Sequence, residues 1–500
     1  MAQAKWMEER QVLARALSDL KPVRTLADRA FSRAAGAPLI PGNRVELLRD
    51  AAENYPAWLE AIARARRYIH FESYIIAEDA EGRRFADALI ERAQAGVQVR
   101  LIYDWVGGFG QASENYWERL RRGGVEVRCY NPFNLLAPFD LVSRDHRKMV
   151  SVDGEVSFVS GLCVGRAWSG IPEKGLGPWR DTGIRIRGPA VADIDRAFAE
   201  MWATLGDPLP PDLEPVASSP AGDMNVRVVA TTPATAGVLR LDQLVTALAR
   251  QRIWLTDAYY AGTTAYAQSL RSAAREGVDV RLLLPGATDI PLLRPLSRSG
   301  YRTLLEAGVR IFEWNGTMLH AKSSVVDGRW ARVGSTNLNI ASWFGNCELD
   351  VVIEDPGFAA QMEAQYLEDL SNATEVVLNA RNRVFAPRPV DAPPTTRMLS
   401  GGGGASTVAA GAARLGHALG AAFIHRRELE PVEAYLTLGI AAVLLAVVAL
   451  LIFFPMVLAW PTAVVLTWVA LTQVVRSVQL WKQLQRSREA ALKPGPDDQG

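Results

Sequence analysis

Cysteine is scarce in this sequence, which has only three among 500 residues, at positions 129, 163 and 347. Their number is odd and no CxxC pair occurs, so neither a disulfide framework nor a zinc site of paired cysteines is indicated. Excess charge is lacking as well, because 55 basic residues balance 54 acidic ones to a net charge of +1. A protein that mainly neutralises a nucleic-acid backbone needs a positive excess. We therefore expect a reducing compartment and no nucleic-acid partner.

The start of the chain also lacks an apolar run of signal-peptide length, since Glu8, Glu9 and Arg10 interrupt it. We expect the body of the protein on the cytoplasmic side of a membrane. The hydrophobic content of 49% is that of a mostly globular chain, and the length allows two to four domains of roughly 100–200 residues.

Histidine is rare too, yet two of the five histidines open the same pattern. The stretch LHAKSSVVDGRWARVGSTN places His320 two residues before Lys322 and seven before Asp327. DHRKMVSVDGEVSFVSGLC repeats this spacing with His146, Lys148 and Asp153. Coincidence is a poor explanation for two such copies.

The sequence around each copy is also repeated. AIARARRYIHFESYI followed by ALIERAQAGVQVRLIYD parallels ALARQRIWLTDAYYA followed by SLRSAAREGVDVRLLLP. Apolar β-like runs alternate with amphipathic helical stretches, the first of them predicted at 44–67, which indicates an α/β class with a mixed sheet flanked by helices. We predict an N-terminal helical arm (1–42), two homologous lobes (43–210 and 222–380) and a flexible Pro- and Gly-rich linker (381–430).

The last part of the chain, 431–480, is predicted to form a transmembrane hairpin. Ala434 to Val475 contains no Asp, Glu, Lys or Arg, which is long enough for two spans of about 20 residues each. A buried helical hairpin of a soluble domain is the alternative. Basic residues flank both ends of the run, so both termini are expected in the cytoplasm.

Each copy of the pattern has the signature of a β-hairpin. Asp153-Gly154 and Asp327-Gly328 stand between alternating apolar residues, which is the strongest short hairpin signal. On an extended strand each histidine and its lysine would share a face. We interpret Asp153 and Asp327 as structural residues that set the turn and form an ion pair.

A histidine beside lysine and small polar donors suits phosphoryl chemistry. Lysine supplies positive charge to phosphate oxygens, Ser335 and Asn337 add neutral donors, one imidazole can attack phosphorus and the other can protonate the leaving oxygen. A single His-x-Lys pair would more often be a solvated strand face, but the duplication reverses this expectation.

The duplicated HxKxxxxDxxxxxxGSxN pattern resembles the phospholipase D superfamily, and the surrounding sequence is similar to its bacterial cardiolipin synthase-like branch. Further likeness lies in ESYII, PWRDTGIRIRGPAV and STNLNIASWFGNCELDVVI. The resemblance covers about 41–375. It implies a two-lobed fold with one active site between the lobes, a phosphohistidine intermediate, and no metal or other cofactor.

The resemblance also implies roles for individual residues. His146 and His320 would be the nucleophile and the general acid, and His146 is preferred as the nucleophile. Asp181 and Glu348 would orient the two histidines. Lys148, Lys322, Ser335, Asn337 and Gly161 would bind the phosphate. Phospholipid substrates, with phosphatidylglycerol foremost, and the bacterial inner membrane are the implied partner and location, whereas the oligomeric state stays open.

Two positions depart from the pattern of this family. Cys163 stands where the first motif should have an asparagine, so a weak thiol donor replaces an amide. Ala341 replaces an arginine often found after the second motif. Cys163 is interpreted as a small buried filler in preference to a catalytic thiol.

Four functions remain open from the sequence alone. A phosphatidyltransferase of cardiolipin-synthase type passes the phosphatidyl group to a lipid hydroxyl, and a phospholipase D-type hydrolase passes it to water. A nuclease is disfavoured by the apolar C-terminal run and the balanced charge. A membrane-tethered lipid-binding protein without activity is disfavoured by the intact second motif.

Overall fold

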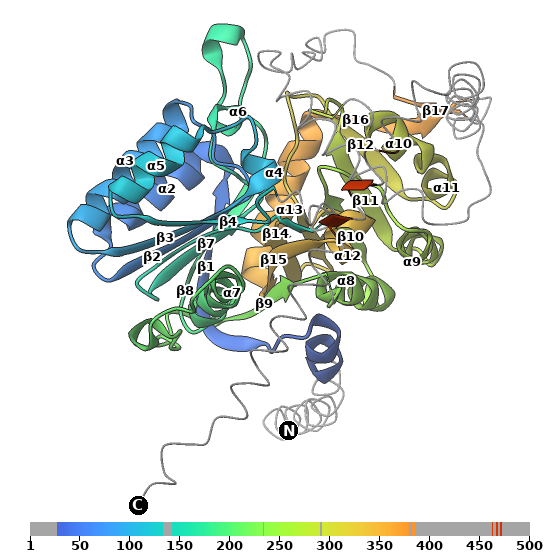
Figure 1. Cartoon of the computed structure of the whole chain (residues 1–500). Coiled ribbons are helices and arrows are strands. Elements are labelled where there is room, and N and C mark those ends of the chain that lie inside the picture. Colours follow the sequence, from blue (N-terminus) through green and yellow to red (C-terminus); the bar gives the residue numbers. More distant parts are fainter. Residues whose placement is uncertain are drawn as a thin grey trace, which may run out of the picture. The chain divides into compact units, whose positions relative to one another are not determined.

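A long mixed β-sheet runs through both halves of the repeat in the computed structural model of the chain (Figure 1). The structure describes residues 28–133, 143–233, 235–290, 293–379 and 383–386, with isolated helical positions at 463, 467–468 and 471–472. Contacts divide the chain into two compact units, 1–130 with 143–426 and 131–142 with 427–500. The sheet, its helices and the site below all belong to the first unit.

The two halves of the sheet have the same strand order, which confirms the duplication. From its outer edge inward, the first half consists of β4 (Glu126–Tyr130), β3 (Gln98–Asp104), β2 (Tyr68–Ser73), β6 (Lys148–Val152), β7 (Val156–Ser160), β8 (Thr182–Arg187) and β1 (Ile40–Arg49). The second half consists of β12 (Arg310–Trp314), β11 (Asp279–Pro285), β10 (Arg252–Thr256), β13 (Ser323–Val326), β14 (Trp330–Gly334), β15 (Asn346–Glu354) and β9 (Met224–Thr231). The equivalent edge strands β1 and β9 pair antiparallel, at Ile40 with Val226, and so join the halves.

Three short strands add to this framework. β16 (Ala373–Leu378) extends the second half beyond β12, and β17 (Val384–Phe385) pairs with β16. β5 (Arg144–Asp145) leaves the first half and pairs parallel with β15 of the second half. This crossing brings the chain just before His146 against the other half.

Helices cover both faces of the sheet. On one face, the first half carries α2 (Asp50–Arg64), α3 (Ala80–Gln94) and α5 (Glu114–Arg122), and the second carries α8 (Gly237–Leu248), α9 (Thr264–Arg275), α10 (Leu293–Ser299) and α11 (Tyr301–Leu305). On the other face, α7 (Val191–Thr204) and α13 (Pro356–Ser371) pack into a core that the two halves share. Short helices complete the order: α4 (Trp105–Gly108), α6 (Arg166–Ser169) and α12 (Ile340–Phe344), with 3-10 turns at Pro172–Lys174 and Pro211–Leu213. The shared core explains why the halves behave as one unit.

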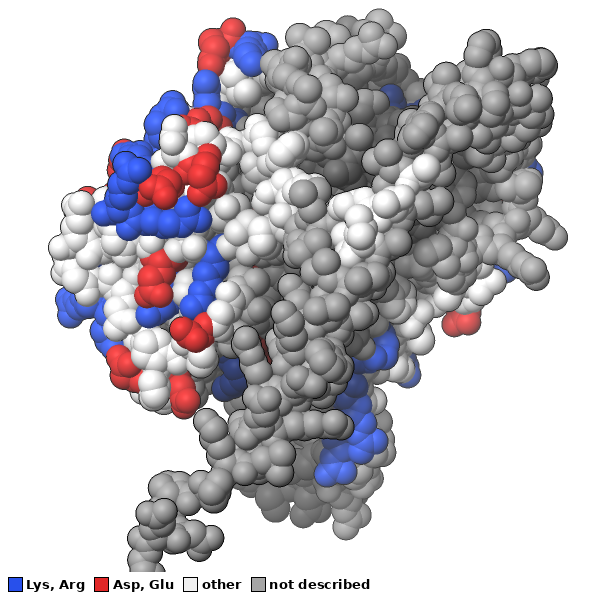
Figure 2. All heavy atoms as spheres, in the orientation of Figure 1, with Lys and Arg blue, Asp and Glu red and all other residues white. Residues whose placement is uncertain are grey.

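The outer helices of the first half carry basic and acidic side chains interspersed with each other (Figure 2). Many of these charges are paired along a helix, as in Arg64 with Glu60 and Arg122 with Glu118. Exposed pairs of this kind contribute little to stability, roughly 0.3–0.5 kcal/mol each. This face is therefore an ordinary solvated helical surface.

Both predicted motif hairpins are present. β6 pairs with β7 and β13 with β14, with every residue of these strands buried. The turn residues Asp153 and Asp327 adopt positive φ angles of 57° and 49°, and a glycine with positive φ follows each. Two successive turn residues with positive φ suit the right-handed twist of the strands.

The carboxylates of these turns accept hydrogen bonds from backbone amides, whereas an ion pair was predicted. Asp153 accepts the amides of Arg66, Arg67 and Tyr68 at 2.8–2.9 Å, which anchors the start of β2. Asp327 accepts the three equivalent amides of 250–252 at the same distances. Each of the two aspartates thus makes charge-assisted bonds to three backbone N–H groups.

Two expectations about local structure were wrong. The helix predicted at 44–67 begins only at Asp50, because 44–49 belong to β1 and pair with β8. His146 and His320 lie just before the strands that begin at Lys148 and Ser323, so a shared strand face does not place them beside their lysines.

Other predicted segments fall partly or wholly outside the described residues. The arm at 1–42 is described only from residue 28, with helix at 28–35. The linker at 381–430 and the membrane hairpin at 431–480 lie almost entirely outside. Within the described part of the chain, no helix is both long enough and apolar enough to cross a membrane.

Candidate active site

Each motif histidine is hydrogen-bonded to a carboxylate supplied by the other half of the sheet. His146 Nδ1 lies 2.8 Å from Glu348 Oε2, which belongs to β15. His320 Nδ1 lies 2.8 Å from Asp181 Oδ2, which immediately precedes β8. All four side chains are at least nine-tenths buried. The predicted pairing of two carboxylates with two histidines is thus present in the structure, crossed between the halves.

The crossing follows from two short parallel contacts between the halves. In one, Asp145 of β5 stands opposite Cys347, and the His146 amide donates to the Cys347 carbonyl at 2.9 Å. In the other, Arg180 stands opposite Leu319, and the His320 amide donates to the Arg180 carbonyl at 2.7 Å. Each carboxylate is the residue directly after its crossing, which puts it beside the histidine of the other half.

The protonation of the two pairs follows from burial and charge. Burial opposes ionisation of Asp181 and Glu348, but their histidine partners and the nearby lysines outweigh it, and both carboxyl pKa values are lowered. Burial lowers the pKa of His146 to about 4 and, with Lys322, that of His320 to about 3. An ionised carboxylate only accepts, so each neutral imidazole carries its proton on Nδ1 and has its lone pair on Nε2.

The two lysines are buried within the same site. Lys148 Nζ donates to the His146 carbonyl, and Lys322 Nζ donates to the His320 carbonyl and lies 3.0 Å from the ring nitrogen Nε2. Burial lowers the pKa of Lys322 to about 8, and the charge of Lys148 adds to the effect. The charge of Lys148 also lowers the pKa of His320, and that of Lys322 lowers the pKa of His146. The two motifs therefore act on each other electrostatically.

The small polar residues that end the motifs contact or make room for the carboxylates. Ser335 Oγ donates to Glu348 Oε2 at 2.6 Å, and Asn346 Nδ2 donates to Glu348 Oε1 at 3.1 Å. The Gly161 amide donates to the Thr182 carbonyl at 3.1 Å, so this donor is already used. A Cβ at Gly161 would lie 2.1 Å from Asp181 Oδ1, which means that Gly161 makes room for the carboxylate. Asn337 is buried, and its Oδ1 accepts no hydrogen bond from the described residues.

Comparison with known proteins identifies this arrangement. The family model described as "Cardiolipin synthase, PLD-like domain" matches residues 58–202 and 245–370, which include both motifs. Cardiolipin synthase A of Pseudomonas aeruginosa (strain LESB58) is 36% identical over 383 residues, covering 76% of each chain. Cardiolipin synthase of Alkalihalophilus pseudofirmus is 32% identical, covering 73% of each chain. The chain belongs to the phospholipase D-like cardiolipin synthase family.

A solved structure agrees with this family at the level of the fold. The phosphatidylserine synthase of Haemophilus influenzae superposes with a TM-score of 0.58 at 15% identity, covering 69% of this chain and 91% of that one. Membership of the cardiolipin synthase family makes this protein an enzyme of phospholipid biosynthesis and a phosphatidyltransferase of the phospholipase D superfamily. The resemblance found in the sequence is confirmed.

Aromatic side chains line the site of this cardiolipin synthase-family enzyme, and two of them, both tyrosines, were missed from the sequence. The ring of Tyr74 lies 5.1 Å from that of His146, and Tyr259 lies 5.8 Å from His320. Trp168 and Trp179 each lie 5.5 Å from His320. The two tyrosines occupy equivalent places in the repeated segments ESY and DAY, which is the signal that could have found them. They give the histidines an apolar surround that supports the low pKa values.

A buried carboxylate also stabilises the second motif. Asp257 accepts the amides of Leu338 at 2.8 Å and Tyr259 at 3.0 Å. Burial raises the pKa of Asp257 to about 7. Its equivalent in the first half, Glu72, is fully buried near Arg147 and has its pKa raised well above normal by burial and by Asp145.

Cys163 is buried in the core of the first half, as expected for a filler. Its carbonyl accepts the Tyr55 hydroxyl at 2.7 Å, and burial raises the pKa of its thiol although the two lysines act against this. A protonated, buried thiol is a weak donor, so the first motif lacks the amide that Asn337 gives the second. No group of three or more His, Cys, Asp or Glu side chains suited to a metal occurs in the described part of the chain.

Proposed function

We propose that this enzyme forms cardiolipin from two molecules of phosphatidylglycerol through a phosphohistidine. His146 Nε2 attacks the phosphorus of the first lipid, forming a P–N bond, while the P–O bond to glycerol breaks. His320 gives its Nε2 proton to the departing glycerol oxygen. In the second step a hydroxyl of another phosphatidylglycerol attacks the phosphorus, His320 takes the hydroxyl proton, and the P–N bond breaks.

The observation that carries this proposal is the crossed pair of histidine–carboxylate hydrogen bonds, at 2.8 Å each. A carboxylate on Nδ1 fixes the tautomer, leaves Nε2 for chemistry, and stabilises the positive charge that each ring acquires in one step. Two such histidines in one site supply the nucleophile and the acid that a two-step displacement needs.

The negative charge of the substrate favours the protonated form of His320 that the reaction requires. Both imidazoles are neutral at neutral pH, since burial lowers the pKa of His146 to about 4 and that of His320 to about 3. An anionic phosphodiester placed between the lysines neutralises part of their charge and thereby favours a protonated His320. The lysines then stabilise the charge that develops on the phosphate oxygens, together with Asn337.

The enzyme is proposed to act at a membrane, because its substrates are lipids. Two lobes, at 43–210 and 222–380, would work on lipid at the cytoplasmic face of the inner membrane. The uncharged run within 431–480 would anchor them as a membrane hairpin. If full-length protein with this segment intact stayed in the supernatant of a detergent-free lysate, the anchoring proposal would be wrong.

The test is a lipid analysis of purified enzyme incubated with phosphatidylglycerol. We expect cardiolipin and glycerol in equal amounts, with no turnover by either His146→Ala or His320→Ala. Phosphatidic acid as the main product would assign water as the acceptor and make the enzyme a hydrolase. Near-normal turnover by one histidine variant would contradict the shared site.

A further inference from the structure

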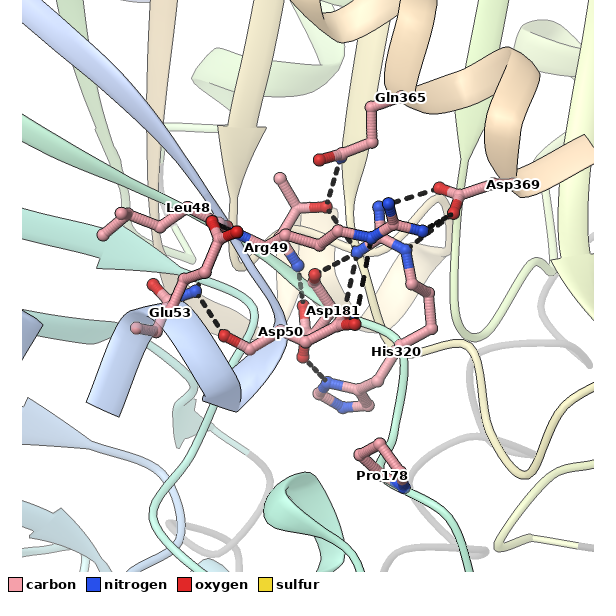
Figure 3. A network of polar contacts seen from close by, with 12 residues as sticks. Leu48, Arg49, Asp50, Glu53, Pro178, Asp181, His320, Gln365 and Asp369 are labelled. Carbon is pink, nitrogen blue, oxygen red and sulfur yellow. Dashed lines mark hydrogen bonds and ion pairs between the residues drawn. The ribbon is translucent and has the colours of Figure 1, made fainter. Parts of the chain in front are cut away.

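Arg180, the residue before Asp181, is 3% exposed, and all three of its guanidinium nitrogens donate hydrogen bonds. The network to which it belongs includes Asp50, Asp181, His320 and Asp369 (Figure 3). Nε and Nη2 donate to the two carboxylate oxygens of Asp369, each at 2.8 Å. Nη1 donates to Asp50 Oδ1 at 3.0 Å and to Thr182 Oγ1 at 3.2 Å. A planar guanidinium that is paired on two sides is held in a single orientation.

These partners tie the two halves of the enzyme together. Asp50 is the first residue of α2 in the first half, and Asp369 lies in the last turn of α13 in the second half. We call Arg180, Asp50 and Asp369 the clasp. Breaking a buried pair of this kind leaves a charge without compensation, so the clasp is a strong constraint on the local geometry.

Backbone hydrogen bonds connect the clasp to the Asp181–His320 pair. Asp50 Oδ1 accepts the Asp181 amide at 2.8 Å, and the Asp50 amide donates to the Asp181 carbonyl at 3.1 Å. The Arg180 carbonyl accepts the His320 amide at 2.7 Å. The clasp therefore holds the backbone of both Asp181 and His320.

The other histidine–carboxylate pair is supported differently. Cys347 precedes Glu348 as Arg180 precedes Asp181, and it has the same backbone bond, to the His146 amide. Its thiol lies 3.9 Å from the Tyr130 hydroxyl, a weak contact. A thiol thus stands at one crossing and a doubly paired guanidinium at the other.

We propose that Arg180, held by Asp50 and Asp369, is a positioning residue for the Asp181–His320 pair and controls proton transfer by His320. This inference rests on the function proposed above, in which His320 is the general acid. Only the crossing at Arg180 has this ion-pair network, so the clasp should affect His320 and not His146. Loosening it should slow the proton-transfer steps and leave substrate binding nearly unchanged.

Loosening the clasp should also move the pH profile. The titratable and charged groups around the His320 ring are Asp181, Lys322, Lys148 and Tyr259. Asp181 favours the protonated ring, whereas both lysines oppose it. A displaced Asp181 leaves the lysines less opposed, so protonated His320 is lost at a lower pH. The alkaline limb of the kcat profile should therefore shift to lower pH.

The experiment compares Arg180→Lys, Asp369→Asn and Asp369→Glu with wild type in the phosphatidylglycerol assay. We expect Arg180→Lys and Asp369→Asn to lower kcat by about 10- to 100-fold, the range typical of residues that orient a catalytic group. KM should stay within about twofold and the alkaline limb should move to lower pH, since binding groups are untouched. Asp369→Glu retains the charge and should restore part of the rate. The matched control is Glu375→Gln on β16, which removes an exposed ion pair to Arg310 at 2.8 Å outside the clasp and should behave as wild type.

Three readouts keep the outcomes apart. Wild-type kcat and pH profile in Asp369→Asn would overturn the inference. A lower Tm and a smaller active fraction, with the remaining enzyme unchanged in kcat and pH profile, would also overturn it, because the clasp would then serve folding alone. The parallel His320→Ala variant tests the function separately: if it retains turnover, the proposed role of His320 fails regardless of the clasp.

Discussion

Replacing Glu348 by glutamine tests how the crossed pairs work. The carboxylate of Glu348 accepts three hydrogen bonds, from His146 Nδ1, Ser335 Oγ and Asn346 Nδ2. A glutamine of the same shape must turn an NH2 group toward one of these donors. Asn346 resolves the conflict, because its Oδ1 is buried and unpaired among the described residues and a flip of its amide would offer that oxygen. The glutamine carbonyl then stays on His146 and Ser335.

The magnitude of the effect follows from this geometry. The tautomer of His146 is kept, so the roughly 10,000-fold loss seen when a triad histidine takes the wrong tautomer does not apply. What disappears is the charge that stabilises the imidazolium-like ring, and a hydrogen bond to a charged group contributes about 1.5–3 kcal/mol. At about 1.4 kcal/mol for each tenfold change, we expect Glu348→Gln to lower kcat between about 10-fold and 150-fold.

The assay is the rate of cardiolipin formation under single-turnover conditions, with Tm as a check on folding. Ser335→Ala is the matched control, since it removes one donor at 2.6 Å but keeps the charge, and its rate should fall less. A Glu348→Gln rate within threefold of wild type would refute the role of this contact. A loss near 10,000-fold would refute the compensating flip of Asn346.

Three other perturbations separate the remaining contacts. Cys163→Asn should keep or raise kcat by restoring an amide donor to the first motif, and a total loss measured in the same assay would instead reveal a function of the thiol. Gly161→Ala would put a Cβ 2.1 Å from Asp181 Oδ1. We expect this overpacking to lower the free energy of unfolding by about 1–3 kcal/mol, and so to lower Tm and kcat. An unchanged Tm would show that the Asp181 side chain moves aside at little cost. Burial lowers the pKa of His146 to about 4 and that of His320 to about 3, so below about pH 6.5 the unfolded chain binds protons that the folded chain does not. The lowered pKa of His320 therefore destabilises the wild type from pH 7 toward pH 4, whereas buried carboxyl groups with raised pKa values, such as Asp257, act in the opposite direction in both proteins. His320→Asn should thus gain Tm relative to wild type over this range; equal slopes would contradict the neutral, buried His320.

The parts of the fold that the sequence predicted are those governed by local rules. Asp-Gly between alternating apolar residues is sufficient for a hairpin, and both motif hairpins form where expected. The first strand was missed because Val45, Leu47 and Leu48 fit a helical spacing as well as an extended one. Only its pairing with β8 and β9, each more than a hundred residues away, decides for a strand.

The site was predictable as a set of residue types but not as an arrangement. The motifs supply the histidines and lysines, and the family resemblance supplies Asp181 and Glu348. Nothing local to any of these residues says that each histidine meets the carboxylate of the opposite half. The clasp was missed for the same reason, because Arg180 and Asp369 are separated by 189 positions and read separately as ordinary charged residues.

Crossing the pairs has a consequence for how a duplicated enzyme can diverge. Each half supplies the histidine of one pair and the carboxylate of the other, so neither half contains a complete pair. The proposed reaction needs the two histidines to differ, one bonded to phosphorus and the other carrying a proton. The halves differ at positions next to the carboxylates, because Arg180 of the first half corresponds to Cys347 of the second, and Gly161 corresponds to Ser335. Because the carboxylate sets how readily its histidine accepts a proton, these are the positions at which a symmetric pair of motifs can acquire two different roles.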